Sequence, residues 1–122
     1  MSSMSETTTA FPLDAVTVVE KPSIEARSWE PLRGLPGVNQ KVLWQSGRMI
    51  AGLVRMDPGA EEPGHVHHDA DHHVYVVDGS ARIAGREVSA GGFVFVPAGV
   101  SHAATDVGPD GCTFFYTYLP RT

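Results

Sequence analysis

The histidines of this chain are confined to one window and are spaced like metal ligands. All six lie between Gly59 and His102, and five of them fall within nine residues. His65 and His67 form a His-x-His pair, which on a strand places both imidazoles on one face because side chains alternate. Neutral imidazole is the commonest protein ligand for metal ions. Since His72 and His102 would complete a tetrahedral or octahedral shell, we predict a metal site.

The two remaining histidines, His68 and His73, are not expected to reach the ion. If His72 points into the protein, strand alternation turns His73 to the opposite face. His68 opens a loop directly after His67, so we expect it in solvent or at the mouth of a pocket. Two alternatives stay open. The histidines could form a surface set without an ion, or water could replace His72 in the shell.

An all-imidazole ligand set would make the bound ion a strong Lewis acid. Such a set suits Zn, Cu, Fe, Ni or Co, and four neutral ligands leave the charge of a divalent ion uncompensated. The ion would then acidify bound water or bind an anionic enolate or catecholate. A six-coordinate ion keeps two positions open for substrate and water or dioxygen, whereas tetrahedral zinc keeps none. The identity of the metal therefore decides between catalysis and a structural role.

The proton-transfer groups of the site stay open at this stage. Side chains on neighbouring strands that could act as general acid or base are Tyr116, Tyr118, Gln45, Arg48 and Arg55. Carboxylates near enough in sequence to hold a ligand imidazole are Glu61, Glu62, Asp69 and Asp71. The sequence singles out none of these, so no catalytic residue is assigned. Cys112 lacks a matched base and is expected to be a small core residue.

Length and composition indicate one ordinary globular domain and exclude several partners. The chain has 122 residues, of which 42% are hydrophobic and 19% charged, which suffices for a single core. A net charge of −5 without a cluster of Lys or Arg argues against nucleic acid. No apolar run approaches the roughly 18–20 residues of a membrane helix. The single cysteine and the lack of a secretory signal favour the cytoplasm.

Glycine and proline divide the chain into short apolar runs, which predicts an all-β barrel or jelly roll. We expect strands at 15–20, 41–45, 49–56, 65–67, 72–77, 81–84, 86–88, 93–96, 101–105 and 112–119. A turn at 46–48 joins two of them, and Asp78-Gly79 is expected to end the strand 72–77 in a hairpin. No apolar stripe with helical spacing extends over about ten residues. Residues 1–12 are expected to form a flexible tail and 13–122 a single barrel domain.

Two separated motifs resemble the sequence motifs of the cupin superfamily. The first contains Gly, His-x-His, Glu and Gly, and its positions fall on Gly59, His65, His67, His72 and Gly79. The second contains Gly, Pro-x-Gly, His and Asn, and its positions fall on Gly91, Pro97, Gly99, His102 and Asp106. His72 therefore stands where the motif has Glu, and Asp106 where it has Asn. The motifs and the strand between them cover about half of the chain.

The resemblance implies a cupin double-stranded β-helix with a metal inside the barrel. A typical cupin binds its ion with three His and one Glu, so His72 makes this chain similar to small cupins of the four-histidine type. The implied ligands are His65, His67, His72 and His102. Cupins similar to this one contain Fe, Mn, Ni, Cu or Zn.

Small cupins commonly pair through their N-terminal strands, which implies a homodimer. The expected strand at 15–20 and the side chains of Trp29 and Trp44 are candidates for such an interface.

Three functions follow from the resemblance. The first is a metal-dependent dioxygenase or other oxidoreductase that acts on a small molecule, by similarity to small cupin dioxygenases. The second is a non-redox cyclase, isomerase or lyase, by similarity to zinc cupins that resemble polyketide cyclases. The third is ligand or metal sensing, because the runs 53–59, 97–102 and 111–114 resemble the cupin half of zinc-dependent anti-sigma factors. No sigma-binding segment precedes the barrel, so the enzyme is the preferred interpretation, and a structural barrel with a vestigial metal is the remaining one.

Overall fold

A computed structural model of the chain describes residues 15–121 as strands around a common core, with a short helix outside the barrel. The elements are α1 (Lys21–Ala26), β1 (Glu30–Pro31), β2 (Val38–Ser46), β3 (Met49–Met56), β4 (Glu62–His65), β5 (Ala70–Ile83), β6 (Arg86–Ser89), β7 (Phe93–Val96), β8 (His102–Thr105) and β9 (Cys112–Pro120). The predicted tail, residues 1–12, lies outside the described residues. Within them, no helix is long and apolar enough to cross a membrane.

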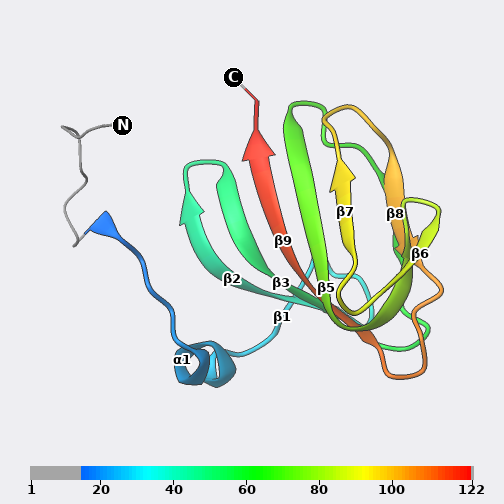
Figure 1. The fold of residues 1–122 in the computed structure, drawn as a ribbon, viewed down its shortest axis with the longest axis horizontal. Coiled ribbons are helices and arrows are strands. Elements are labelled where there is room, and N and C mark those ends of the chain that lie inside the picture. The colour runs from blue at the N-terminus through cyan, green and yellow to red at the C-terminus, as the bar shows by residue number, and fades with distance from the viewer. Residues whose placement is uncertain (1–14, 122) are drawn as a thin grey trace, which may run out of the picture.

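The strands form one curled antiparallel sheet, as predicted for a cupin barrel (Figure 1). Its order is β1-β2-β3-β9-β5-β8-β4, and β6 and β7 pair with β5. The 14-residue strand β5 belongs to both halves of the fold. Its first part pairs with β9 and β7, and its last part pairs with β6 and β8.

The predicted hairpin at Asp78-Gly79 is wrong, because β5 continues through both residues to Ile83. The register shifts between Val76 and Asp78, where the strand passes from one half of the barrel to the other. Gly79 has a φ of +76°, and a Cβ atom there would lie 1.9 Å from the carbonyl oxygen of Gly111. The glycine thus allows a bend and a close backbone contact inside a strand, rather than a turn.

The run 15–20 was also predicted wrongly, since none of its residues belongs to a strand. Val16 and Val18 are exposed, and within the described part of the chain the run has no sheet partner. The helix α1 follows it. Pro22 lies in the first turn of α1, where the missing N–H of proline costs nothing. Six residues are too few to show a helical period in the sequence.

Most other boundaries agree with the sequence. The turn between β2 and β3 lies at residues 47–48, and β7 has the predicted bounds. Ala84 and Gly85, with φ values of 51° and 82°, form the two-residue turn between β5 and β6. Positive φ at both central residues is the geometry that matches the twist of a hairpin.

The two ends of the barrel strands differ in what they bury. At the apolar end, the register aligns Val38, Met56 and Cys112, which are 2% exposed or less. At the histidine end, the same sheet aligns Ile50, Tyr118 and His72. On β5, Val74 and Val76 point inward as predicted, while Tyr75 and Val77 are exposed.

Candidate metal centre

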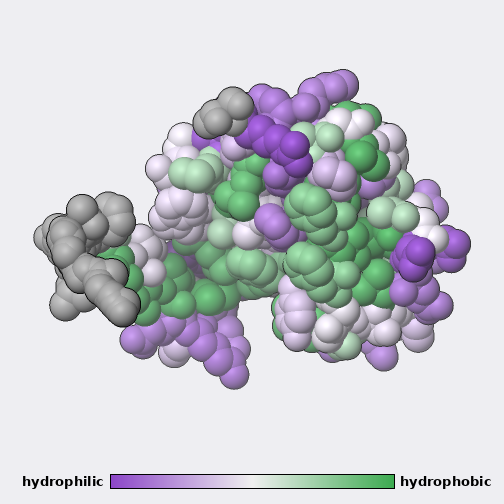
Figure 2. All heavy atoms as spheres, turned by 45° about the horizontal axis from the view of Figure 1, so that its top comes forward, coloured by the Kyte–Doolittle hydropathy of each residue, from purple (hydrophilic) through white to green (hydrophobic). Residues whose placement is uncertain are grey.

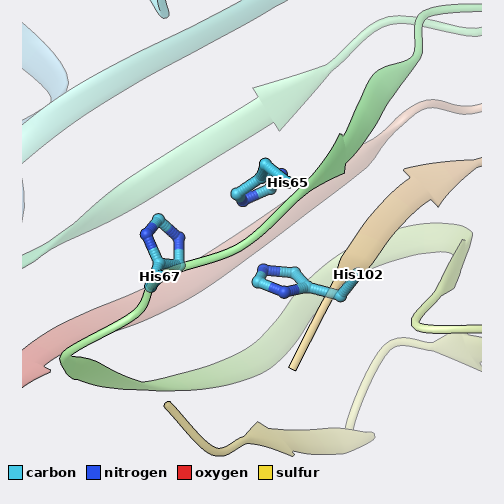
Figure 3. Close-up of side chains that lie close together, drawn as sticks. All are labelled: His65, His67 and His102. Carbon is cyan, nitrogen blue, oxygen red and sulfur yellow. The ribbon is translucent and has the colours of Figure 1, made fainter. Parts of the chain in front are cut away.

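Three histidines meet inside the histidine end of the barrel (Figure 3). His65 is the last residue of β4, and His102 is the first residue of β8 and pairs with it in register. His67 lies two residues beyond His65, in the connection to β5. One ring nitrogen from each of the three residues lies within 4.8 Å of the other two. The His-x-His pair thus converges, but not along one strand as predicted, because β4 covers Glu62–His65 rather than 65–67 and His67 lies beyond its end.

Backbone carbonyls orient two of these rings. His65 Nδ1 lies 3.0 Å from the carbonyl oxygen of Pro63, and His102 Nδ1 lies 3.1 Å from that of Val100. A carbonyl oxygen can only accept, so each Nδ1 carries the hydrogen and each Nε2 presents a lone pair. This is how proteins fix the tautomer of a metal-binding histidine. Carbonyl oxygens thus hold these two rings, a role for which the sequence left four carboxylates open as candidates.

Two buried ring nitrogens at this end have no hydrogen-bond partner among the described residues. They are His102 Nε2 and His72 Nδ1. An unpaired buried polar atom costs about 1–3 kcal/mol, so each of these nitrogens calls for a partner. A metal ion would satisfy such lone pairs. The donor set therefore fits a transition metal.

His72 lies beside the three-histidine cluster but is not part of it. Its ring centroid is 5.4 Å from that of His67 and 5.5 Å from that of His102. It projects from β5 on the inner face, next to Val74 and against Tyr116. All four predicted ligands thus lie at one end of the barrel. Ring nitrogens of three of them, His65, His67 and His102, lie within 4.8 Å of one another.

The environment favours the neutral form of His67, His72 and His102. Burial, together with the charges of His65 and His102, lowers the pKa of His67 to about 4. Burial and the neighbouring histidines lower the pKa of His72 to about 3. Burial also lowers the pKa of His102. Neutral imidazole is the form that binds a metal, so these histidines can bind an ion at neutral pH without first losing a proton.

His68 and His73 lie away from the cluster, as expected. His68 is exposed in the loop before β5. His73 points to the outer face, where Nδ1 lies 2.8 Å from Thr117 Oγ1 and the ring packs against Phe95. The loop carboxylates are also occupied elsewhere. Asp69 pairs with Arg48, and Asp71 pairs with Arg121 and accepts the Ala98 N–H.

A cavity of about 360 Å³ opens against the cluster. Its lining residues are Leu32, Arg33, Gln40, Ile50, Val54, Glu62, His65, His67, His72, Phe114, Tyr116 and Tyr118. Tyr116 donates its hydroxyl hydrogen to Gln40 Oε1 at 3.3 Å, and Tyr118 packs edge-on against His67. Burial raises the pKa of Tyr116. Of the proposed acid and base candidates, only the two tyrosines line this cavity, while Gln45, Arg48 and Arg55 do not.

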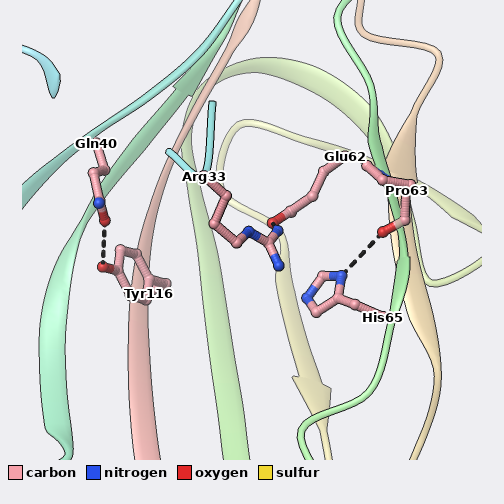
Figure 4. Close-up of polar contacts among 6 residues, drawn as sticks. All are labelled: Arg33, Gln40, Glu62, Pro63, His65 and Tyr116. Carbon is pink, nitrogen blue, oxygen red and sulfur yellow. Dashed lines mark hydrogen bonds and ion pairs between the residues drawn. The ribbon is translucent and has the colours of Figure 1, made fainter. Parts of the chain in front are cut away.

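Sequence reasoning missed one charged pair in the lining. Arg33 lies in the connection between β1 and β2 and forms an ion pair with Glu62, the first residue of β4 (Figure 4). Arg33 carried no signal in the sequence beyond its place in a Pro- and Gly-rich connection. Glu62 was one of four carboxylates that spacing could not separate.

The family described as the ChrR cupin-like domain matches residues 20–121. The chain is a cupin of this family. No curated protein matches it significantly.

Solved structures agree with a cupin barrel. An RmlC-like cupin from Shewanella frigidimarina is 30% identical, with a TM-score of 0.67 over 79% of this cupin and 86% of that chain. The polyketide cyclase RemF from Streptomyces resistomycificus is 22% identical, with a TM-score of 0.71 over 88% and 80%. The anti-sigma ChrR of Rhodobacter sphaeroides, in complex with SigE, is 23% identical, with a TM-score of 0.66 over 77% and 50%. The last two likenesses show the fold alone.

In this cupin, the second motif positions His102 through a turn. Val100 N–H bonds the Pro97 carbonyl, and Gly99 N–H bonds the His67 carbonyl at 2.8 Å. The Val100 carbonyl in turn accepts from the His102 ring. The motif therefore ties the segment before β8 to the His-x-His segment. Asp106, at the Asn position of the motif, is exposed beyond β8 and has a φ of 51°.

Proposed function

We propose that this cupin is a metal-dependent enzyme that acts on a small molecule. His65, His67 and His102 hold the ion, and His72 is its fourth ligand. The observation that carries this proposal is the convergence of three imidazoles, two of them oriented by carbonyls, beside a cavity that His65 and His67 line. The unpaired Nδ1 of His72 supports the fourth ligand.

The protein's own contribution to the reaction is binding, orientation and proton supply. A divalent transition metal bound there would supply Lewis acidity and, if it is redox-active, electron transfer. Leu32, Ile50 and Val54 give the cavity an apolar wall that fits the carbon skeleton of a small molecule. The raised pKa of Tyr116 keeps its phenol protonated, so it can donate a hydrogen bond to a substrate oxygen.

Oxidation of the substrate with dioxygen is the first reaction that we propose, by the resemblance to small cupin dioxygenases. The ion is then one of Fe, Mn, Ni or Cu.

A non-redox cyclase, isomerase or lyase is the second candidate, with Zn as the ion. The likeness of the barrel to the polyketide cyclase RemF over 88% of the chain supports it.

Ligand or metal sensing without catalysis is the third candidate. It is supported by the family match, since ChrR is an anti-sigma protein in the complex with SigE.

Metal analysis of protein purified without a metal-chelating column tests the proposal. We expect close to one ion per chain, loss of the ion in His67→Ala and His102→Ala, and retention in His73→Ala, whose ring faces outward. Fe, Mn, Ni or Cu would direct the search to oxygen consumption with diketones and catechols, and Zn to cyclisation and isomerisation. Bound metal without turnover of any substrate class would favour sensing. A protein that takes up none of these ions contradicts the proposal.

We also propose a homodimer through the outer face of the sheet. The register places Leu53, Phe115, Tyr75 and Phe93 in one row across β3, β9, β5 and β7. Phe93 is 60% exposed and Tyr75 is 48% exposed. Figure 2 shows hydrophobic surface that continues across one side of the molecule. A symmetric pair would cover such a row with an identical row.

Light scattering on Phe93→Ser tests the dimer. We expect the mass of two chains for the wild type and of one chain for the variant. Val100→Ser, an exposed apolar residue in the turn before β8, is the control and should leave the mass unchanged. A monomeric wild type would contradict this part of the proposal.

A further inference from the structure

The cavity contains one permanent cation and one carboxylate among its lining residues. They are Arg33 and Glu62, which reach it from separate parts of the chain. A side-chain nitrogen, Arg33 Nη2, contacts Glu62 Oε2. The arginine side chain is 47% exposed and the glutamate 13%, so the pair lies where the cavity meets the surface. The proposed reaction does not yet use either residue.

The pair leaves most of the guanidinium free. A guanidinium has five N–H donors and can bind a carboxylate through two parallel hydrogen bonds. Only the single Nη2–Oε2 contact joins Arg33 to Glu62 in the described chain. In Figure 4, the guanidinium lies beside the Glu62 carboxylate and one of its nitrogens points toward His65. Arg33 lines the same cavity as His65 and His67, which places it near the cluster.

Arg33 lies in a tight, hydrogen-bonded turn. Arg33 has a φ of 51°, in the left-handed region that residues other than glycine seldom adopt. The turn is closed by Leu35 N–H bonding the Leu32 carbonyl and by Leu32 N–H bonding the Val38 carbonyl, both at 3.0 Å. Strained backbone persists where surrounding contacts enforce it, and it is concentrated at ligand-binding sites.

We propose that Arg33 recognises a carboxylate on the substrate, and that Glu62 occupies this position on the guanidinium when the cavity is free. The inference rests on the proposed function and names its substrate class. The substrate is a small, partly apolar carboxylate with a second oxygen that faces the histidines. One carboxylate replaces another, so the charge beside Arg33 is unchanged on binding. The apolar residues Ile50, Val54 and Phe114 contact the rest of the molecule.

Glu62 lines the cavity as Arg33 does, and Arg33 is the side-chain partner of its carboxylate among the described residues. Glu62 therefore competes with the substrate for Arg33, and removing its charge should strengthen substrate binding. Removing the charge of Arg33 should weaken it. A purely structural ion pair would instead give the same sign for both substitutions.

Binding of salicylate and salicylamide, measured by calorimetry on zinc-loaded protein, tests this inference. The two probes share a ring and a phenolic oxygen, and only salicylate carries a carboxylate. We expect the wild type to bind salicylate about ten-fold more tightly or better, the effect of one charged hydrogen-bond pair. Arg33→Gln should abolish the preference, and Glu62→Gln should raise the affinity for salicylate. Arg48→Gln is the matched control, because Arg48 pairs with Asp69 and does not line the cavity.

Each outcome decides the inference. No preference for salicylate in the wild type, a preference retained in Arg33→Gln, or weaker salicylate binding in Glu62→Gln overturns it. The zinc content of the same samples tests the proposed function separately. If the protein takes up no zinc, the metal site fails, and the titrations repeated on that metal-free protein still show whether Arg33 selects the carboxylate.

Discussion

The apolar end and the histidine end of the barrel are built from the same strands but bury opposite kinds of side chain. Along β3 and β9, Met56 and Cys112 close one end, and Ile50 and Tyr118 line the cavity at the other. At the apolar end, burial and the charge of Asp78 raise the pKa of Cys112 to about 11, which makes it an inert core thiol. The histidine end holds two buried ring nitrogens without partners. The fully buried apolar side chains thus lie at one end of these strands, and the histidine cluster lies at the other end.

Met56→Ala should give the largest change in stability. Its side chain is fully buried, so the substitution removes apolar contacts and leaves a cavity, and we expect a loss of about 2–5 kcal/mol in the free energy of unfolding. Denaturant unfolding of metal-free protein measures this. Met49→Ala, at an exposed position of the same strand, is the control. A similar loss in both variants would remove the distinction between the two ends.

Metal should stabilise the protein only through the histidine end. At a free metal concentration about 100 times the dissociation constant, the expected gain is about 2.7 kcal/mol. Thermal unfolding with and without EDTA measures the difference. The gain should persist in Met56→Ala and disappear in His102→Ala. If it persisted in His102→Ala, the ion would be bound elsewhere.

Acid should destabilise metal-free protein through the same residues. The folded pKa values of His67 and His72, about 4 and about 3, lie below the ordinary value of 6.5. The unfolded chain therefore binds protons first as the pH falls below 6.5, and stability decreases until the folded histidines also titrate. Above 6.5 these residues contribute no pH dependence. Unfolding at pH 7, 6 and 5 in EDTA measures the slope, which should be smaller in His72→Gln and unchanged in Met56→Ala.

Tyr116→Phe should have the smallest effect on stability. It removes the hydrogen bond to Gln40 and keeps the ring, so we expect a loss of about 0.5–1.5 kcal/mol. Metal content should not change. A reduced metal content would show that the Tyr116 hydroxyl helps to hold the histidine cluster. Metal binding would then depend on the cavity wall as well as on the ligands.

Local patterns were enough to predict part of the arrangement that carries the site. Alternation separated His72 from His73 on β5, and it depends on a period of two that needs no tertiary information. It did not predict how His65 and His67 meet, because β4 ends at His65 and His67 lies in the connection after it. The prediction of a hairpin at Asp78-Gly79 was wrong because it also used only local information. Its local preference is for a turn, and only the contact with Gly111, a residue far along the chain, shows why the strand continues.

Features that depend on distant partners could not be predicted. The valines of the run 15–20 favour a strand, but within the described residues no neighbouring strand pairs with them. Arg33 lies in an irregular connection, and its role depends on Glu62, which approaches from a different strand. The orienting carbonyls of Pro63 and Val100 belong to the backbone, so side-chain identities carry no direct trace of them.

The position of β9 in the sheet has a consequence for synthesis on the ribosome. This strand follows the others in the described chain, yet it lies between β3 and β5. Until residues 112–120 have left the exit tunnel, β3 and β5 each expose an unpaired edge, which is a template for association with other chains. Tyr116 and Tyr118 belong to the same strand and line the cavity. The nascent chain therefore lacks this part of the cavity wall until β9 has emerged.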